Sequence, residues 1–340
     1  MIVTYLRSSS YNNYAYCEMQ YFITYVLGYQ SLSGKKADLG TIVHKVMEAL
    51  ASLKKELQNN TSAKNITIID DALGEISVTK TSLYKDAIIK TLLDKSFEYY
   101  SNRSPHNTFS KADKQNCLSM CFDTIQFNSG QFDPRNRHIV AAEPHFDILI
   151  EEEWAKYQYE IDGKVINGQL AIKGTIDLVT EIDENTMEIV DYKTGRRLDW
   201  ATGEEKTYAK LNTDPQLLLY NYAISKLFPQ YRQAIMSIFF IKDGGPFSMC
   251  FDRSDHDKFL EMLRVRFQEI QANNAPKPIS NDRSSWKCTK LCHFCKNNWP
   301  ETNQSMCVYI DSYIQKHGIN KTITDCKREG FDIGFYEAPG

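Results

Sequence analysis

Two short segments of the sequence carry acidic residues and a lysine at spacings that could do chemistry together. Residues 174–177 read Gly-Thr-Ile-Asp and residues 188–195 read Glu-Ile-Val-Asp-Tyr-Lys-Thr-Gly, and both lie in runs with strand composition. Side chains alternate along a strand, so Asp191 and Lys193 point to the same face, roughly 6–7 Å apart along the chain. Turn-forming residues separate the two runs, which predicts a β-hairpin. A suitable register then places Asp177, Asp191 and Lys193 in one pocket.

These three residues have the chemistry needed to cut a phosphodiester bond. Two carboxylates can hold a hard divalent cation, and a nearby ammonium can orient a water molecule or stabilise developing charge. An Asp-x-Lys pair is also common on solvated strand faces, so the interpretation depends on the rest of the chain.

The overall charge gives no support to a protein that binds nucleic acid with its whole surface. The 340 residues carry a formal net charge of −3 and a pI near 6.2, so any DNA-binding surface must be local. Basic residues cluster after the proposed site and on an expected later helix, at Lys193, Arg196, Arg197, Lys258, Arg264 and Arg266. No clear linker divides the chain, and we expect residues 1–340 to form a single domain.

The sequence contains no run of about 18 apolar residues, which argues against a membrane span or a membrane partner. The first residues, Met-Ile-Val-Thr-Tyr-Leu-Arg, lack a signal-peptide pattern. We therefore expect a cytoplasmic, intracellular protein. In that compartment nine cysteines, an odd number, indicate metal ligation or burial rather than a disulfide framework.

The pattern of apolar residues predicts an α/β protein. Helical patterns occur at 14–28, 41–57, 82–101, 110–127, 214–227 and 255–271. Strand patterns occur at 138–152, 156–166, 170–182, 186–194, 234–241 and 247–252. Residues 58–80 are polar, and we expect them to be irregular. The order of the elements predicts an α/β core that carries a helical insertion at 58–135.

Four polar residues outside the hairpin could complete a site. His44 lies beside the apolar stripe of its expected helix, and a neutral imidazole is a good metal ligand. Glu143 interrupts a strand-like run and could add a third carboxylate at the metal or help to orient Lys193. Gln216 and Tyr220 are four residues apart on an expected helix, so both polar groups lie on one face and can contact phosphate oxygens or the lysine. Each of the four also has an ordinary structural interpretation when it is taken alone.

Four cysteines within 20 residues form a strong metal-binding signal late in the chain: Cys288, Cys292, Cys295 and Cys307. Two chemistries compete. A zinc site could use all four thiolates, and a [4Fe–4S] cluster could use three of them with a distant fourth. Cys17 is the obvious fourth ligand, and it would tie the two ends of the chain together. The remaining cysteines are interpreted as core or incidental residues: Cys117, Cys121, Cys250 and Cys326.

Taken together, these residues resemble the RecB-like branch of the PD-(D/E)xK nuclease superfamily. The matching elements, in the family's order, are His44, Gly174-x-x-Asp177, Asp191-x-Lys193 and Gln216-x-x-x-Tyr220. The segments Cys17-Glu18 and Leu39-Gly40-Thr41 look similar as well. The resemblance covers roughly residues 8–50 and 138–307, whereas residues 58–135 match nothing in it. It implies a restriction-endonuclease-like core, in which a central mixed sheet is flanked by helices.

The resemblance also implies two kinds of metal centre. Asp177 and Asp191 would ligate Mg²⁺ or Mn²⁺, with His44 and the carbonyl oxygen of Tyr192 as further ligands. Many members of this branch, including the AddB subunit and the nucleases of CRISPR adaptation, also carry an iron–sulfur staple built from one early cysteine and three late ones.

In this chain the staple would be a [4Fe–4S] cluster that closes the C-terminal cysteine cluster onto the N-terminus. Its ligands would be Cys17, Cys292, Cys295 and Cys307. The family usually has three closely spaced late cysteines, whereas this chain has four with a long final gap. Cys288 is therefore an alternative to Cys292 or Cys307, and Zn²⁺ is the alternative metal.

The family implies roles for the other site residues. Lys193 would position the attacking water and stabilise the transition state, Gln216 and Tyr220 would contact the DNA strand or brace the site, and Glu143 would be an additional participant. The implied activity is metal-dependent hydrolysis of DNA by an exonuclease in recombination, repair or processing. A DNA with a free end would be the substrate, and a helicase or recombination protein would be the partner.

Two interpretations from other classes compete with the nuclease. The first is a catalytically silent iron–sulfur protein that binds DNA as one component of a larger nuclease/helicase complex; the presence of Asp177, Asp191 and Lys193 argues against it. The second is a zinc-ribbon protein with an unrelated β domain, which leaves Cys17 and His44 unexplained. The sequence leaves open the polarity of digestion, single- or double-strand preference, exonuclease or endonuclease action, DNA or RNA as substrate, and the oligomeric state.

Overall fold

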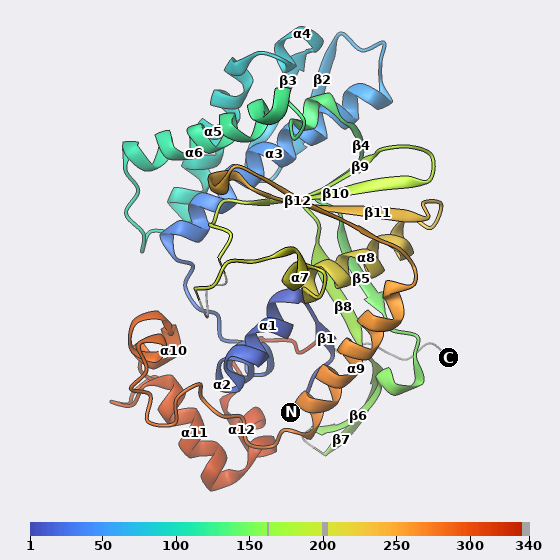
Figure 1. Cartoon of the computed structure of the whole chain (residues 1–340). Coiled ribbons are helices and arrows are strands. Elements are labelled where there is room, and N and C mark those ends of the chain that lie inside the picture. Colours follow the sequence, from blue (N-terminus) through green and yellow to red (C-terminus); the bar gives the residue numbers. More distant parts are fainter. Residues whose placement is uncertain (162, 199–202, 335–340) are drawn as a thin grey trace.

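A five-stranded mixed sheet forms the centre of the computed structural model, which describes residues 1–161, 163–198 and 203–334 (Figure 1). Its strands are β4 (His138–Ala142), β9 (Leu178–Glu181), β10 (Thr186–Lys193), β11 (Gln233–Phe240) and β12 (Gly245–Phe251). Their order is β12-β11-β10-β9-β4; the β10–β11 pair is parallel and the other pairs are antiparallel. The prediction of an α/β fold with a central mixed sheet is confirmed.

The predicted hairpin is formed by β9 and β10. Leu178 pairs with Val190 in its antiparallel ladder. Asp177 immediately precedes Leu178 and Asp191 immediately follows Val190, so the register brings the two aspartates side by side. β10 is buried along six of its eight residues, because helices cover both faces of the sheet.

A second, three-stranded sheet contains β1 (Tyr5–Leu6), β8 (Ala171–Thr175) and β5 (His145–Leu149), in that order. The chain crosses from one sheet to the other between β4 and β5, and again between β8 and β9. At these crossings the Glu143 N–H donates to the Asp177 carbonyl at 3.0 Å, and the Ile176 N–H donates to the Pro144 carbonyl at 3.2 Å. The two crossings are therefore hydrogen-bonded to each other, and each carries one candidate site residue.

The runs 138–152 and 170–182 thus each contain two strands of different sheets, where the composition had indicated single runs. Glu143 ends β4 with a φ of +46°, a left-handed conformation that costs a non-glycine residue roughly 1–2 kcal/mol. Composition identifies a β-forming run but does not show where a strand leaves its sheet. Strain of this kind occurs mostly where surrounding structure enforces it, and functional sites are the usual place.

Helices cover both faces of the five-stranded sheet (Figure 1). On one face lie α3 (Lys35–Asn59), α5 (Asp86–Arg103) and α6 (Lys111–Gln126), and on the other lie α1 (Ser8–Tyr16), α8 (Pro215–Leu227) and α9 (Asp255–Ala272). Alternate residues of β10 follow this division. Val190 and Tyr192 belong to the hydrophobic cluster that contains α3, whereas Met187 and Ile189 belong to the cluster that contains α8.

The expectation that residues 58–80 are irregular is wrong. They contain an antiparallel hairpin of β2 (Asn65–Asp70) and β3 (Gly74–Thr79), which leads into α4 (Lys80–Leu83). Ile66 and Ile76 are buried, but Ile69 is 86% exposed. With so few buried apolar residues, the hairpin has a weak sequence signal. The helices α5 and α6 confirm the two helical patterns that follow, and the bounds of an insertion at 58–135 stay a prediction.

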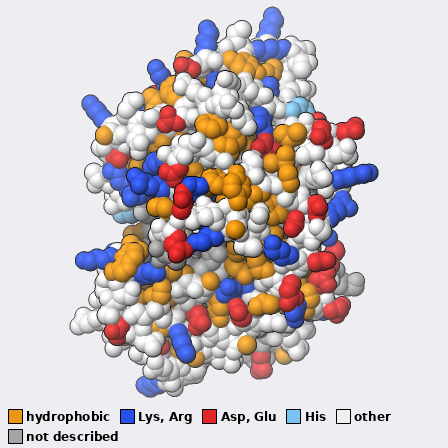
Figure 2. Space-filling model, in the orientation of Figure 1, with side chains coloured by type: hydrophobic (Ala, Val, Ile, Leu, Met, Phe, Trp, Pro, Cys, Tyr) orange, Lys and Arg blue, Asp and Glu red, His pale blue; other side chains and the backbone are white. Residues whose placement is uncertain are grey.

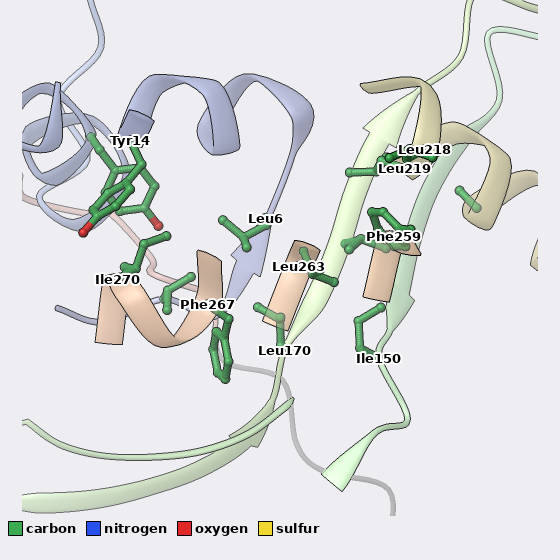
Figure 3. Packing of buried hydrophobic residues seen from close by; sticks show 14 of the residues in the cluster. Leu6, Tyr14, Ile150, Leu170, Leu218, Leu219, Phe259, Leu263, Phe267 and Ile270 are labelled. Carbon is green, nitrogen blue, oxygen red and sulfur yellow. The ribbon is translucent and has the colours of Figure 1, made fainter. Parts of the chain in front are cut away.

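The apolar face of α9 anchors the three-stranded sheet. Its buried residues occur at helical spacing and face buried residues in and beside the strands of that sheet (Figure 3): Phe259, Leu263, Phe267 and Ile270 on α9, and Leu6, Ile150 and Leu170. Full burial of such a side chain contributes about 1.5–3 kcal/mol. This packing fixes β8, and with it the crossing that leads to Asp177.

The early helices and the late helical segment of the chain lie side by side (Figure 1). After α1 come α2 (Glu18–Tyr21) and a π-helix (Phe22–Val26), and the late segment contains a π-helix (Lys287–Leu291), α10 (His293–Lys296), α11 (Met306–His317) and α12 (Ile319–Cys326). The Met19 N–H donates to the Lys277 carbonyl at 3.1 Å, and the Lys277 N–H donates to the Glu18 carboxylate at 2.8 Å. The expected helix at 14–28 is interrupted at Cys17, whose backbone is extended.

The remaining elements are the hairpin β6 (Lys156–Ile161) and β7 (Lys164–Gln169), the short helix α7 (Tyr208–Leu211), and 3₁₀ turns at Phe127–Ser129, Pro134–Asn136, Glu153–Ala155 and Ile241–Asp243. In the part of the chain that the structure describes, no helix has the length and apolar character needed to cross a membrane.

Candidate active site

Asp177 is anchored at the crossing between β8 and β9 by two neighbouring elements. Its Oδ2 accepts a hydrogen bond from the Tyr192 N–H at 2.9 Å, which ties it to β10. The same oxygen lies 3.3 Å from Nδ1 of His44 on α3. The predicted proximity of His44 and Asp177, which are 133 positions apart in the sequence, is therefore present in the structure.

Asp191 and Lys193 lie on the same face of β10, as strand alternation predicts. The Lys193 Nζ is 2.7 Å from Oδ2 of Asp191, and the side chain of Asp191 is only 5% exposed whereas that of Lys193 is 35% exposed. The ammonium therefore neutralises a buried carboxylate while one side of it still faces the solvent. That is the position in which a lysine can also meet an anionic substrate.

The helix α8 braces this ion pair. Gln216 donates its Nε2–H to Oδ1 of Asp191 at 3.1 Å and accepts from Lys193 at 3.5 Å. It also contacts the hydroxyl of Tyr220 at 2.9 Å, and that hydroxyl donates to the carbonyl of Thr175 at 2.8 Å. The predicted pair Gln216 and Tyr220 thus joins Asp191 to the end of β8. Both residues act within the protein here, as braces of the site.

The sequence determines where α8 begins. Asp214 caps the helix by accepting from the Gln216 N–H at 2.8 Å, and Pro215 occupies the first helical position. Proline is favoured there because its fixed φ suits a helix start and no N–H is needed. The cap holds Gln216 in the first turn of α8, directly beside Asp191.

Two glycines permit the close approach of the surrounding elements. Gly40 lies on α3 one turn before His44, and a Cβ at this position would be 2.8 Å from Oγ1 of Thr194. Gly174 lies opposite Phe146, and a Cβ there would overlap the phenyl ring. The same ring makes an edge contact with Tyr220. Absence of a side chain at these two positions lets α3 and the Phe146–Tyr220 pair close around the site.

Burial and the neighbouring charges shift the pKa values of the four central groups. Burial lowers the pKa of His44, but the carboxylates of Asp177 and Asp191 outweigh it and the net shift is upward. Burial raises the pKa of Asp191, and this effect prevails. For Asp177 the opposing effect of His44 and Lys193 prevails over burial and lowers the pKa. For Lys193 the two aspartates overcome burial and raise the pKa.

Glu143 lies at the edge of this group rather than at its centre. A pocket beside Asp177 is lined by His44, Met47, Glu48, Glu143, Asp177, Leu178 and Tyr192. Oε2 of Glu143 is 3.7 Å from the ammonium of Lys45. Within the described ranges, Glu143 forms no hydrogen bond or ion pair with Lys193, so an orienting role toward Lys193 finds no support in the geometry.

Sequence reasoning missed Lys45, Glu48 and Asp70, which form a charged network around Glu143. The Lys45 ammonium lies 2.5 Å from Glu48 and 3.2 Å from Asp70. Burial and the hydrogen bond with Glu143 raise the pKa of Glu48 to about 8. A signal was available, because His44 and Glu48 are four residues apart and must share one face of α3. Asp70 had no such signal, since it reaches the site from the unexpected β2–β3 hairpin.

The comparisons with known proteins identify a family. Residues 8–299 match the sequence model of a family described as the PD-(D/E)XK nuclease superfamily. The chain belongs to this superfamily. Over 194 residues, 56% of this chain, it is 23% identical to one component of the ATP-dependent helicase/deoxyribonuclease of Streptococcus uberis, and it spans 14% of the length of that protein. A solved structure from Eubacterium rectale described as an exonuclease aligns over 88% of this chain and 90% of its own, at 10% identity and a TM-score of 0.46.

Membership of the PD-(D/E)XK superfamily supports a nuclease. By their order and spacing in the chain, we propose that Asp177 is the first acidic residue of the superfamily's signature and that Asp191 and Lys193 form its (D/E)-x-K element. Among the residues described, no group of three or more His, Cys, Asp or Glu side chains has a geometry that could hold a metal ion. In the structure the Lys193 ammonium lies against Asp191, and His44 lies against Asp177.

Five cysteines from both ends of the chain line a second pocket: Cys17, Cys288, Cys292, Cys295 and Cys307. Cys17 caps α2 and its sulfur accepts from the Gln20 N–H at 3.4 Å. The Cys295 thiol, hydrogen-bonded to its neighbours, lowers the pKa of Cys292 to about 6 and that of Cys307 to about 7. Burial raises the pKa of Cys17 to about 11.

The other cysteines lie elsewhere. Cys117 and Cys121 are fully buried in the cluster that contains α3, as expected for core residues. Cys250 is exposed on β12, and Cys326 is buried at the end of α12.

Because Gln216 braces Asp191, we predict that replacing Gln216 lowers the stability of the folded protein. Gln216→Leu leaves the buried Oδ1 of Asp191 without its amide donor, and an unsatisfied buried group costs about 1–3 kcal/mol. We expect the free energy of unfolding in urea to fall by that amount. The matched control is Gln315→Leu, which removes an exposed amide–carboxylate contact with Asp311 on α11 and should change stability by less than about 0.5 kcal/mol. Equal effects of the two substitutions would contradict the brace.

Proposed function

We propose that this protein is a divalent-metal-dependent deoxyribonuclease that hydrolyses phosphodiester bonds in DNA. The observation that carries the proposal is the buried Asp191–Lys193 pair, held by Gln216 and adjacent to Asp177. Any buried ion pair needs further hydrogen bonds of the kind that Gln216 supplies. The feature that suits an anionic substrate is the lysine, which is 35% exposed and fixed beside two carboxylates.

The donor set around Asp177 fits Mg²⁺ or Mn²⁺. The residues that would hold the ion are His44, Asp177, Asp191 and the carbonyl oxygen of Tyr192, and oxygen donors with one imidazole suit these cations. In the structure His44 and Lys193 lie against acidic oxygens of the two aspartates, so these carboxylates are compensated by cationic groups. A bound ion would neutralise phosphate charge and lower the pKa of a bound water.

Lys193 supplies the remaining charge. Its ammonium is fixed by Asp191 and Gln216, and its exposed side can donate to a phosphate oxygen or hold the attacking water. Gln216 and Tyr220 hold Lys193 and Asp191 in a fixed position relative to the end of β8. Glu143 and its neighbour Lys45 form the outer wall of the site, where they bias its charge.

The finer features of the function rest on the resemblance and on the relative. DNA as the substrate, and a helicase as a partner, are what the name of the Streptococcus uberis protein suggests. Action on a free end, as an exonuclease in recombination, repair or processing, follows from the RecB-like motifs.

The test is cleavage of end-labelled linear DNA, single- and double-stranded, beside closed circular DNA, with Mg²⁺ or Mn²⁺. Asp191→Asn and Lys193→Met should each lower the rate at least about 10²-fold, because each removes a charge that acts on the transition state. The matched control is Glu184→Gln, in the exposed turn of the same hairpin, which should cleave like the wild type. Loss of linear but not circular DNA would establish the exonuclease. Equal rates in all variants would contradict the proposed site, and an inactive wild type would favour the silent DNA-binding protein.

We further propose that the second pocket holds a [4Fe–4S] cluster. The structure gathers five unpaired cysteines from both chain ends around one pocket, which is the donor chemistry that an iron–sulfur cluster uses. Cys17, Cys292, Cys295 and Cys307 are the proposed ligands, with Cys288 as the alternative late ligand. A bound cluster would cross-link the N-terminal helices to the late segment and stabilise the fold by closing a long loop.

The cluster predicts a defined iron and sulfide content. Protein purified without oxygen should contain both and absorb visible light, and Cys17→Ser and Cys292→Ser should each lose most of the iron. The control is Cys250→Ser, on exposed β12, which should retain it. Comparison of Cys288→Ser with Cys307→Ser identifies the remaining late ligand. If the wild-type protein contains zinc but no sulfide, the zinc site is correct and the iron–sulfur cluster is not. If the intact protein contains neither iron nor zinc, the proposal of a metal centre in this pocket is contradicted.

A further inference from the structure

A mostly buried guanidinium lies against one of the five cysteines that line the second pocket. Nε of Arg283 donates to Sγ of Cys307 at 3.4 Å, and the side chain of Arg283 is only 17% exposed. In the described part of the chain, no other Lys or Arg side chain donates a hydrogen bond to a sulfur of this pocket. A guanidinium is a strong partner for a thiolate and a weak one for a neutral thiol, so the contact indicates a sulfur that carries negative charge.

The guanidinium has a partner for each of its three nitrogens. Nε faces Cys307, Nη1 donates to the Asn281 carbonyl at 3.0 Å, and Nη2 forms an ion pair with Asp311. The planar guanidinium has its donors in a fixed fork, so three separate acceptors fix its plane and its position. Arg283 therefore presents a fixed positive charge to the pocket, unlike a lysine at the end of a mobile chain.

The backbone at Arg283 is held in an unfavourable conformation. Its φ is +57°, in the left-handed region that residues with a Cβ rarely adopt. The Arg283 N–H donates to the Ser280 carbonyl at 3.0 Å, and the carboxylate of Asp282 accepts from the Ser284 N–H at 3.0 Å. Strain of this kind persists where the surrounding structure enforces it, often at functional sites. The turn directs the side chain of Arg283 toward α11.

The helix α11 presents both of the charged partners of Arg283. Cys307 and Asp311 are four residues apart, so they share one face of the helix. Cys307 is the second residue of α11, where unpaired backbone N–H groups favour negative charge. The helix start and Arg283 thus act on Cys307 in the same direction. Cys288, the alternative late ligand, lies in the five-residue π-helix and receives no hydrogen bond from a charged side chain of the described residues.

The charges on the surface do not replace this local effect. On the face shown in Figure 2, acidic and basic side chains are scattered over the lower left part, where Figure 1 shows α10, α11 and α12. No dense patch of one sign covers that part of the face. Exposed charges are also screened by salt, whereas buried ones are screened much less. The charge that the cysteine pocket experiences is therefore set mainly by the Arg283–Asp311 pair.

We propose that Arg283 is a positioning residue of the cysteine centre, which fixes Cys307 rather than Cys288 as the late ligand and raises the reduction potential of the bound cluster. The inference rests on the proposed [4Fe–4S] cluster and deepens it. Reduction adds negative charge, so the potential of a cluster depends on nearby charge and on hydrogen bonds to its sulfurs. Arg283 stabilises the reduced state more than the oxidised state, and the carboxylate of Asp311 partly opposes this effect.

The test is a redox titration of protein purified without oxygen, followed by the visible absorbance of the cluster. Arg283→Met removes the donor and the charge, and it should lower the equilibrium constant for reduction about tenfold, which is about 59 mV for a one-electron couple. Asp311→Asn keeps an oxygen that can accept from Arg283 but removes the opposing charge, so the potential should rise. The control is Lys316→Gln, an exposed lysine of the same helix, which should leave the potential unchanged.

The opposite signs separate this role from a structural one, because a disturbed fold would not raise the potential in one variant and lower it in the other. Asp311→Asn tests the sign on its own if Arg283→Met takes up no iron. Potentials equal to that of the control, or shifts of one sign in both variants, would contradict the role of Arg283 while the cluster itself stands. Loss of iron from Cys288→Ser but not from Cys307→Ser would overturn the choice of Cys307. A wild type without iron would instead refute the proposed cluster, and this inference with it.

Discussion

The structure depends on holding Asp177 and Asp191 together in a place with little water. At an effective dielectric constant of about 20, any two like charges that approach to about 4 Å repel by about 4 kcal/mol, a large part of the roughly 5–15 kcal/mol that stabilises a typical domain, so neighbouring buried carboxylates need compensating groups. The protein opposes this repulsion with His44, Lys193 and the backbone N–H of Tyr192. His44 comes from α3, whereas Tyr192 and Lys193 both lie on β10, so α3, β10 and the crossing to β9 must all be in position to compensate the two carboxylates. A divalent cation would meet the same requirement more fully, which is why a site of this composition is suited to bind one.

The crossings between the two sheets make this arrangement possible. The register of β9 and β10 places Asp177 opposite Asp191, and the crossing places Asp177 just before β9, where its carboxylate lies 3.3 Å from His44 of α3. The strained backbone of Glu143 and its hydrogen bond to the Asp177 carbonyl lock the crossing. Packing of α9 beneath β8 and the absence of a side chain at Gly174 fix the strand that leads into it. The strained backbone of Glu143, the glycine at position 174 and the packing of α9 thus all help to fix the crossing that carries Asp177.

Local patterns in the sequence were sufficient to predict the hairpin, the shared face of Asp191 and Lys193, and the pair Gln216 and Tyr220 on one helix face, because each depends on periodicity within a few residues. The superfamily is confirmed by the match over residues 8–299, and the mixed sheet by the strand order and pairing in the structure. Contacts that depend on a change of sheet were not visible. Nothing in the composition of 138–152 shows that the chain turns at Glu143, and nothing in 58–80 shows a hairpin that sends Asp70 to Lys45. Long-range charge networks of this kind depend on tertiary packing. Only the spacing of His44 and Glu48 on one helix face indicated in the sequence that charged residues gather near Glu143.

The central claim is that His44, Asp177 and Asp191 form one charge-balanced site whose natural complement is a divalent cation. The most direct measurement is thermal unfolding of the wild type and of Asp177→Asn across a titration of Mn²⁺ or Mg²⁺, with Glu184→Gln as the control. Binding to the folded state alone stabilises it by about 2.7 kcal/mol at a hundredfold excess over the dissociation constant. We predict that the unfolding temperature of the wild type and the control rises with metal concentration, whereas that of Asp177→Asn does not. A wild type that metal leaves unchanged, or an equal rise in the variant, would contradict the account.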